Sequence, residues 1–354
     1  MTATKIDSAS GVMIPTTAIL ELTYKCNHKC KFCSCPWEAT AEGCTKYEKG
    51  AEMTFEEWKR ALDILASLGV KNLSISGGEA LMCEHLLPIL DYIRSRDVFN
   101  RGSRIVVISN GLLMNEDYLR AFKKYDVHLS MSLPGIETFK YHTGVDNVKG
   151  VLHWFGQAKK MGLHTTVNVT VTKQNYHELF ATLAMGLISG ADTILLNRFL
   201  PGGRGLSYVD DLVLNFEQLQ GMLDIAEEVL THSGKVGAVG TEFPKCVMND
   251  ADKYKRLRVG TMCSAAKEFF VVDPSGIIRT CNHSPRKVGH IFSEPIIFDI
   301  EYWNIFQNRA YIPTECTSCS ELSYCDCGCR EAACIAKGNV CALDPCIDKV
   351  KIKK

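Results

Sequence analysis

The sequence has no net charge, no long apolar run and no pattern of an N-terminal signal peptide. Its 40 Lys and Arg residues balance 40 Asp and Glu residues, which argues against nucleic acid as a partner. No apolar run reaches the roughly 18 residues of a membrane helix, so no membrane contact is expected. The polar residues 1–11 lack the basic and then apolar regions of a signal peptide. We therefore expect a cytoplasmic protein.

Cysteine, by contrast, is abundant, with 17 residues in 354. Four lie between Cys26 and Cys35, ten lie between Cys263 and Cys346, and three fall between these groups. An odd number cannot pair completely as disulfides, and in a reducing compartment clustered cysteines usually bind metal or act in catalysis. The distribution predicts metal sites near both ends of the chain.

Short β-rich runs alternate with helical patterns from Thr17 to Arg198. The expected strands are residues 18–22, 72–76, 104–109, 127–132, 165–171 and 193–198. The expected helices are residues 54–68, 84–94, 116–124, 148–160, 176–188 and 215–232. Six βα units in series predict an α/β fold with a parallel sheet and right-handed crossovers. Periodicity alone does not decide between an open doubly wound sheet and a partial barrel. In both folds the functional residues lie at the carboxyl ends of the strands.

The ends of these elements carry local signals. Thr54 and Glu57 have the spacing of a capping box, and Gly69 fits a C-terminal cap. Residues 234–261 are expected to be irregular. We place a domain boundary near Phe243, which gives domains at 1–242 and 243–354. The second domain is rich in Cys, Gly and Pro, so we expect metal to organise it.

The first cysteine cluster contains the spacing CxxxCxxC, formed by Cys26, Cys30 and Cys33 directly after the first expected strand. Three thiolates on one loop suit three irons of a cubane cluster, with the fourth iron open to another ligand. A zinc knuckle is the alternative, completed by Cys35 or His28, because structural zinc takes four protein ligands.

A second motif, Gly77-Gly78-Glu79, follows the second expected strand. By itself it is also compatible with a simple glycine turn. Together with the CxxxCxxC loop and its aromatic residue before the third cysteine, it resembles the radical S-adenosylmethionine (SAM) superfamily. That resemblance implies a partial (β/α)6 radical SAM barrel. It also implies a [4Fe–4S] cluster on the three cysteines and a GGE segment that binds the SAM amino group.

Weaker SAM-binding positions follow from the same resemblance, and each is equally compatible with an ordinary polar residue of the barrel. They lie at or near the ends of the third to sixth expected strands and are Ser109, Asn110, Ser130, Ser132, Asn168 and Arg198.

The C-terminal cysteines have their own spacing. Gly276 and Cys281 form GxxxxC, and a Cx2Cx5Cx3C run is followed after a gap by Cys346. This resembles the SPASM extension of radical SAM peptide maturases and implies two auxiliary iron–sulfur clusters of the [4Fe–4S] type, with a zinc ribbon as the alternative. The implied ligands of the first are Cys263, Cys281 and Cys329, and those of the second are Cys316, Cys319, Cys325 and Cys346.

The first auxiliary cluster lacks a fourth cysteine at the position where fully ligated members have one. The resemblance leaves that iron open or completed by Cys246 or Cys327. The remaining thiols fit no cluster pattern and are expected to be ordinary side chains, one of which could act as a hydrogen donor; they are Cys44, Cys83, Cys334 and Cys341.

The resemblance implies an oxidoreductase that cleaves SAM to a 5′-deoxyadenosyl radical and removes hydrogen from a substrate C–H bond. The leading substrate is a ribosomally made precursor peptide, modified by a C–C or thioether crosslink or by epimerisation, with an electron donor such as flavodoxin or ferredoxin. A small-molecule dehydrogenase of natural-product biosynthesis is an alternative. A sulfatase maturase is less favoured, because Asn282 stands where those enzymes carry a catalytic Asp. A zinc-organised interaction module is the non-enzymatic alternative.

Overall fold

The computed structural model describes residues 5–6, 11–39, 47–100, 102–248 and 250–347. Its strands are β1 Lys5–Ile6, β2 Met13–Ile14, β3 Thr17–Glu21, β4 Asn72–Ser76, β5 Ile105–Ser109, β6 Val127–Ser132, β7 Thr165–Val171, β8 Thr193–Arg198, β9 Val236–Val239, β10 Leu257–Val259, β11 Phe269–Val272, β12 Ile277–Arg279 and β13 Gly289–His290. Its α-helices are α1 Phe55–Ser67, α2 Leu86–Ser95, α3 Glu116–Lys124, α4 Phe139–Thr143, α5 Val148–Lys160, α6 Leu179–Ser189, α7 Val209–Leu212, α8 Phe216–Ser233, α9 Ile300–Gln307 and α10 Arg330–Lys337.

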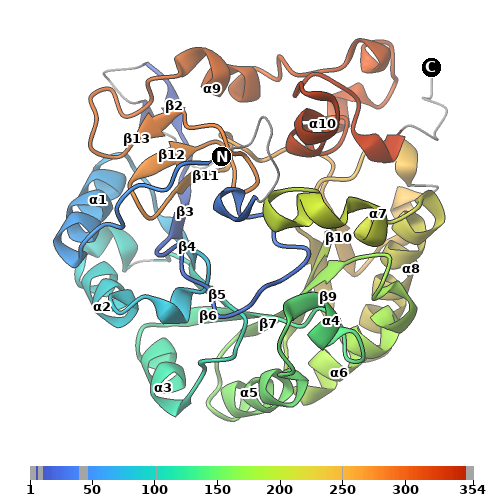
Figure 1. Cartoon of the computed structure of the whole chain (residues 1–354), viewed down its shortest axis with the longest axis horizontal. Coiled ribbons are helices and arrows are strands. Elements are labelled where there is room, and N and C mark those ends of the chain that lie inside the picture. Colours follow the sequence, from blue (N-terminus) through green and yellow to red (C-terminus); the bar gives the residue numbers. More distant parts are fainter. Residues whose placement is uncertain (1–4, 7–10, 40–46, 101, 249, 348–354) are drawn as a thin grey trace.

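One curved sheet organises this part of the chain. Its order is β10-β9-β8-β7-β6-β5-β4-β3-β11-β12-β13, and every pair from β10 to β11 is parallel. Strands β3 to β8 are neighbours in sequence order, as in a singly wound barrel and unlike a doubly wound sheet, in which the order reverses. Helices such as α1, α3, α5 and α8 lie around the outside of the curve (Figure 1). The fold is therefore the expected partial α/β barrel.

Helix α1 illustrates why the expected helices form. The buried side chains Trp58, Ala61, Leu62 and Leu65 recur at spacings of three and four, which gives the helix one apolar face toward the sheet. Thr54 and its partner three residues later make both hydrogen bonds of the predicted capping box. These features confirm the pattern on which the helix was predicted.

The expectation that residues 234–261 are irregular is wrong. They contain β9 and β10, which continue the parallel sheet beyond β8. The carboxylate of Glu227 on α8 accepts hydrogen bonds from the backbone N–H groups of Lys255 at 2.9 Å and of Leu257 at 2.8 Å. A side chain about thirty residues away in sequence thus positions β10. This strand has three residues, which are too few to show a periodic pattern in the sequence.

The C-terminal region joins the other end of the sheet. Strand β11 pairs with β3 in parallel register, and β12 and β13 continue the sheet as antiparallel strands. Helices α9 and α10 lie on this side of the molecule (Figure 1). Buried residues of both expected domains, among them Leu20 and Trp303, belong to one apolar core within the described residues. The boundary near Phe243 stays a prediction.

None of the helices in the described ranges has both the length and the apolar character needed to span a membrane.

Candidate active site

The loop that carries Cys26, Cys30 and Cys33 leaves β3 at its carboxyl end. The side chain of Glu52 holds its start, because it accepts hydrogen bonds from the Thr23 hydroxyl at 2.9 Å and from the next backbone N–H at 2.8 Å. Further on, the loop's N–H groups at positions 29 and 31 donate to carbonyls at the end of α4, at 2.9 and 2.8 Å. The loop is therefore fixed by neighbouring strand ends and does not extend freely into solvent.

The three thiols of this loop lie close to one another and partly buried. Burial, with a smaller contribution from the negative charge of Cys33, raises the pKa of Cys26 to about 11. Burial also raises the pKa of Cys30, with Cys33 and Cys26 contributing. A hydrogen bond from the Cys35 thiol lowers the pKa of Cys33. The thiols thus share one electrostatic environment, in which a bound cation would stabilise all three thiolates.

A glycine-rich turn closes over the loop from a later part of the chain. The backbone N–H of Gly205 donates to the Cys33 carbonyl at 3.0 Å, and the Arg204 guanidinium donates to the Cys30 carbonyl at 3.3 Å. Arg204 also forms an ion pair with Glu38. The 3-10 helix Gly203–Tyr208, which begins in this segment, therefore packs directly on the cysteine loop.

The GGE turn packs directly on the cysteine loop. Gly77 has φ of +141°, and the N–H of Gly78 donates to the Thr23 carbonyl at 2.7 Å. The N–H of Glu79 donates to the Lys25 carbonyl at 2.8 Å. A Cβ on Gly78 would overlap this same carbonyl group. Only glycine permits so close an approach of two backbones, so the two motifs form one structural unit.

The Glu79 carboxylate is buried and fully engaged. It accepts hydrogen bonds from the Ser109 hydroxyl at 2.7 Å, from the Asn110 backbone N–H at 2.7 Å and from the Leu81 N–H at 3.1 Å. Burial raises the pKa of Glu79, and these hydrogen bonds oppose the rise. The side chain therefore ties the end of β5 to the GGE turn. The Asn110 side chain in turn donates to the Asn27 side chain on the cysteine loop at 2.7 Å.

The other expected SAM contacts lie on the next strands, where their role stays a prediction. The buried Ser130 hydroxyl has no hydrogen-bond partner among the described residues. Ser132 and Asn168 are register neighbours on β6 and β7, and the Asn168 side chain accepts a hydrogen bond from Asn197 at 3.0 Å. Buried polar groups normally have partners, so the Ser130 hydroxyl fits a polar ligand inside the barrel.

Arg198, which ends β8, is held by an ion pair, and its expected contact with SAM stays a prediction. Its guanidinium forms a buried, two-pronged ion pair with Asp344, whose side chain is 0% exposed. Asp344 also accepts the N–H groups of Cys329 at 2.7 Å and Cys346 at 3.0 Å. The pair links the barrel to the C-terminal cysteines, a partnership that the sequence did not indicate.

A second fully buried carboxylate, Asp326, makes a similar link. It accepts the N–H of Cys263 at 2.8 Å, the Lys267 ammonium at 2.7 Å and the Tyr311 hydroxyl at 2.8 Å. The Arg309 guanidinium donates to its other oxygen at 2.6 Å. Asp326 is the neighbour of Cys325 in sequence, so it connects the two expected cysteine groups.

The C-terminal cysteines separate into two groups. Burial raises the pKa of Cys263 and of Cys281, and each is raised further by Cys329. A cavity elsewhere in the region is lined by the other group, which comprises Cys246, Cys316, Cys319, Cys325 and Cys327. The first group contains all three ligands expected for the first auxiliary cluster. Cys246 and Cys327, the candidates to complete that group, lie with the second group instead.

In the described part of the chain, no three His, Cys, Asp or Glu side chains converge as ligands of one metal ion do. A four-iron cluster binds its cysteines through separate irons, so its ligands need not converge on one point. The soft thiolate donors of the three groups suit such clusters. Cys44 lies outside the described residues.

Sequence reasoning missed a buried ion pair near the cysteine loop. The Arg279 guanidinium, fully buried at the end of β12, pairs with Glu21 at the end of β3. The rings of Trp37 and Tyr47 lie 5.8 and 5.7 Å from this guanidinium. Tyr47 donates a hydrogen bond of 2.5 Å to the buried Asp273 carboxylate. The position of Arg279 inside the GxxxxC motif was the one available signal.

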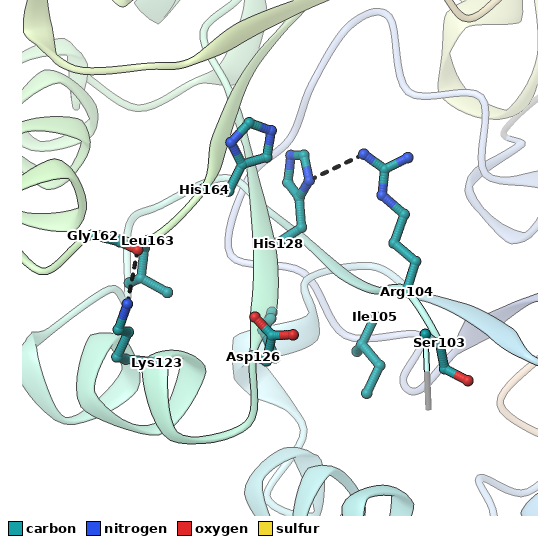
Figure 2. A pocket seen from close by; sticks show the side chains of 11 residues that line it. Ser103, Arg104, Ile105, Lys123, Asp126, His128, Gly162, Leu163 and His164 are labelled. Carbon is teal, nitrogen blue, oxygen red and sulfur yellow. Dashed lines mark hydrogen bonds between the residues drawn. The ribbon is translucent and has the colours of Figure 1, made fainter. Parts of the chain in front are cut away.

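A separate pocket lies at the opposite end of the strands and takes no part in this site (Figure 2). Arg104, Asp126 and His164 each directly precede a strand of the sheet, so they mark its amino-terminal edge. The Arg104 guanidinium lies 3.4 Å from the His128 ring, as the dashed line in Figure 2 shows. Burial, with smaller contributions from the charges of His164 and Arg104, lowers the pKa of His128 to about 4.

Comparison with known proteins gives a domain match and similar proteins over most of the chain. Residues 20–185 match the Radical SAM superfamily model. The PqqA peptide cyclase of Rhodopseudomonas palustris is 25% identical over 361 residues, covering 95% of this chain and 89% of that protein. The PqqA peptide cyclase of Gluconobacter oxydans is 25% identical over 363 residues, covering 95% of this chain and 93% of that protein.

Two solved structures share the fold. Streptococcus suis SuiB bound to precursor peptide SuiA superposes with a TM-score of 0.70 and 14% identity, over 96% of this chain and 77% of that one. Native anSMEcpe with bound AdoMet gives a TM-score of 0.71 and 14% identity, over 93% of both chains. With its cysteine loop, GGE turn and parallel barrel, the chain contains a radical SAM domain and is an enzyme that uses a [4Fe–4S] cluster and SAM, similar over most of its length to radical SAM enzymes that act on peptides.

Proposed function

We propose that this enzyme modifies a ribosomally made precursor peptide at a C–H bond. The two PqqA peptide cyclases match 95% of this chain, and this similarity supports a peptide substrate. The observation that carries the proposal is the packing of the GGE turn on the cysteine loop at the carboxyl ends of the parallel strands. That edge is where barrels of parallel strands carry out their chemistry.

In this proposal, Cys26, Cys30 and Cys33 hold the [4Fe–4S] cluster, and Gly77, Gly78 and Glu79 form the adjoining edge of the SAM site. The contacts proposed on the next strands are Ser109, Asn110, Ser130, Ser132 and Asn168. When bound, the cluster and SAM supply a radical that removes a hydrogen atom from an unactivated C–H bond.

The protein's own residues position the reacting groups and exclude water from them. Glu79 orients the end of β5 through the two hydrogen bonds of Ser109 and Asn110. The Glu21–Arg279 ion pair lies beside the cysteine loop. Both of its charges are fixed in place and buried from solvent. Such a dry, rigid surrounding keeps a reactive substrate group in place and limits side reactions.

The C-terminal cysteines are proposed to hold two auxiliary iron–sulfur clusters. Cys263, Cys281 and Cys329 form one site, and the cavity with Cys316, Cys319 and Cys325 forms the other. These clusters would accept the electron that the substrate radical loses, together with a proton, as the crosslinked product forms. The reductant is proposed to be a flavodoxin or ferredoxin. A cytoplasmic location follows from this need for reduced thiols.

The test begins with the first three cysteines. Protein prepared without oxygen is expected to cleave SAM to 5′-deoxyadenosine and to lose both the activity and about four irons per chain when Cys26, Cys30 and Cys33 are replaced by Ala. Cys83→Ala is the matched control, because Cys83 is a buried thiol outside all three groups. Unchanged iron in the triple variant would contradict the assignment.

The substrate is tested with peptides encoded beside the gene. A crosslink is expected to remove a pair of hydrogen atoms from the peptide mass, whereas epimerisation in deuterated water would add deuterium without oxidation. Turnover of a small alcohol, with no change in any neighbouring peptide, would instead establish the dehydrogenase alternative. Zinc in place of iron would refute both enzymatic functions.

A further inference from the structure

Helix α6 is apolar on every side, although one of its sides faces solvent. Its residues 179–189 include no Asp, Glu, Lys or Arg, whereas each of the other α-helices in the described residues carries at least one. The large side chains of Phe180, Met185 and Ile188 are 44%, 40% and 77% exposed. A helix that is hydrophobic all round is normally buried, so the outer side of α6 has the composition of a covered surface.

The outer side chains of α6 form one continuous strip. Phe180, Ala184 and Ile188 recur at intervals of four residues, and Ala181 and Met185 lie beside them. Residues with this spacing share one side of a helix, and the buried residues of α6 lie on the opposite side, toward the sheet. We call these five residues the α6 face. Contiguous apolar surface of this kind marks interaction sites on soluble proteins.

Two helices of opposite charge flank the α6 face. Helix α5 lies on one side, where a Cβ on Gly156 would be 3.4 Å from the Ser189 carbonyl oxygen, and α8 lies on the other, where a Cβ on Gly221 would meet the Tyr176 hydroxyl (Figure 1). Helix α5 has three lysines and no acidic residue, whereas α8 has four acidic residues and no Lys or Arg. The apolar strip therefore separates a basic helix from an acidic one.

The flanking charges are open to a partner. Lys149 and Lys160 are exposed near the two ends of α5, and Glu217 and Glu228 are exposed on α8. No ion pair or side-chain hydrogen bond within the described ranges involves any of these four residues. The two lysines are separated by as many positions as the two glutamates, about 16 Å along a helix. The basic and the acidic flank therefore carry their charges at matching intervals.

This arrangement favours one way of packing two copies of the chain. If a twofold axis runs along α6, the two α6 faces meet and each α5 lies opposite the α8 of the other copy, so lysines oppose glutamates. If the axis runs across α6 instead, α5 lies opposite α5 and α8 opposite α8, and like charges meet. The charge pattern therefore fits a second copy of this chain and selects the axis along the helix.

We propose that the α6 face, flanked by α5 and α8, is the interface of a homodimer whose twofold axis runs along α6. Neighbouring helices pack about 10 Å apart, so the three helices cover roughly 25 Å by 20 Å, and two such surfaces bury about 1,000 Å² in total. This area is at the lower bound for specific association, so the dimer dissociates on dilution. The interface lies on the outer wall of the barrel, and each copy keeps its own active site.

The experiment measures the mass of the full-length protein, prepared without oxygen, by sedimentation equilibrium over a range of concentrations. A monomer–dimer equilibrium is expected. Ile188→Lys places a charge within the α6 face and is expected to raise the dissociation constant about tenfold or more. Phe298→Lys is the matched control, because Phe298 is 54% exposed and lies outside the face. A wild-type protein that stays monomeric, a dimer that Ile188→Lys leaves intact, or equal losses in both variants overturns the proposal.

A charge exchange tests the direction of the axis. Lys160→Glu and Glu228→Lys each place like charges together at two points of the dimer, so each alone is expected to raise the dissociation constant about threefold or more. The double variant restores opposite charges and is expected to recover the wild-type constant. With the axis across α6 the double variant would not recover, and that result refutes the proposed interface. Both side chains are exposed, so equal iron content and SAM cleavage in all variants check that folding is unchanged.

A lipid surface is the competing occupant of an apolar face. Vesicles of phosphatidylcholine and phosphatidylglycerol are the probe, and the dimer predicts no binding that Ile188→Lys removes. A monomeric wild-type protein that binds these vesicles through Ile188 would assign the α6 face to lipid and refute the dimer. Neither result depends on the substrate, so both are independent of the proposed function.

Discussion

The ion pair between Arg198 and Asp344 allows a quantitative prediction. The side chains of Arg198 and Asp344 are 5% and 0% exposed, so solvent cannot replace a lost partner. Replacing Arg198 by Met leaves the Asp344 carboxylate without a cationic partner, with hydrogen bonds from the N–H groups of Cys329 and Cys346 and from the Cys346 thiol. Removing one partner of a buried pair costs about 3–5 kcal/mol. We expect a loss of this size in the free energy of unfolding.

The magnitude is measured by urea unfolding of variants with equal iron content. Arg120→Met is the matched control, because Arg120 is 59% exposed and ion pairs open to solvent contribute little to stability. The double variant Arg198→Met with Asp344→Asn removes both charges. It is expected to be more stable than the sum of the single losses predicts, by about 2 kcal/mol or more. Additive losses, or a cost no larger than that of Arg120→Met, would refute the reasoning.

Three further predictions concern other parts of the chain. Gly78→Ala is expected to displace the cysteine loop and reduce its iron content, whereas Gly260→Ala, where a Cβ has open space, leaves iron unchanged; equal iron in both contradicts the packing argument. Thr54→Ala removes the capping box with Glu57 and is expected to cost about 1 kcal/mol in thermal unfolding, and a similar loss in Thr54→Ser would argue against a hydroxyl cap. The folded-state pKa of His128 is lowered to about 4, below the roughly 6.5 of a histidine in an unfolded chain. Between these two values the unfolded state binds more protons than the folded state. The free energy of unfolding should therefore fall as the pH drops from about 6.5 to 4, by about 2 kcal/mol after allowance for partial exposure. His128→Gln should lack this slope in unfolding measured across that pH range, and an identical slope would exclude His128 as its source.

The expected barrel strands are close to those observed because each buried run has enough residues to display its pattern. Strands β6, β7 and β8 match the prediction residue for residue. The shorter strands β9 and β10 were not predicted, because hydrogen bonds from another helix hold β10 in place. Sequence periodicity reports burial along one element and has no information on such distant partners.

The candidate site was predictable where spacing alone carries the chemistry. The cysteine loop and the GGE turn are local motifs, and both lie at strand ends. Arg198 shows the limit of this reasoning. Its place at a strand end suggested a ligand contact, but the partner that decides its role, Asp344, lies 146 residues away in sequence. Cys246 has the same property, since only the fold brings it to the cavity of the C-terminal cysteines.

The pairing of β11 with β3 has a consequence for how the chain can be divided. Strand β3 is flanked by β4 on one side and by β11 on the other, so both of its edges are covered. A chain shortened at residue 242 would expose one edge of β3, the strand that leads into the cysteine loop. Unpaired edges of buried strands invite pairing between molecules. The C-terminal region thereby also protects the barrel from self-association, and the two expected domains should unfold together.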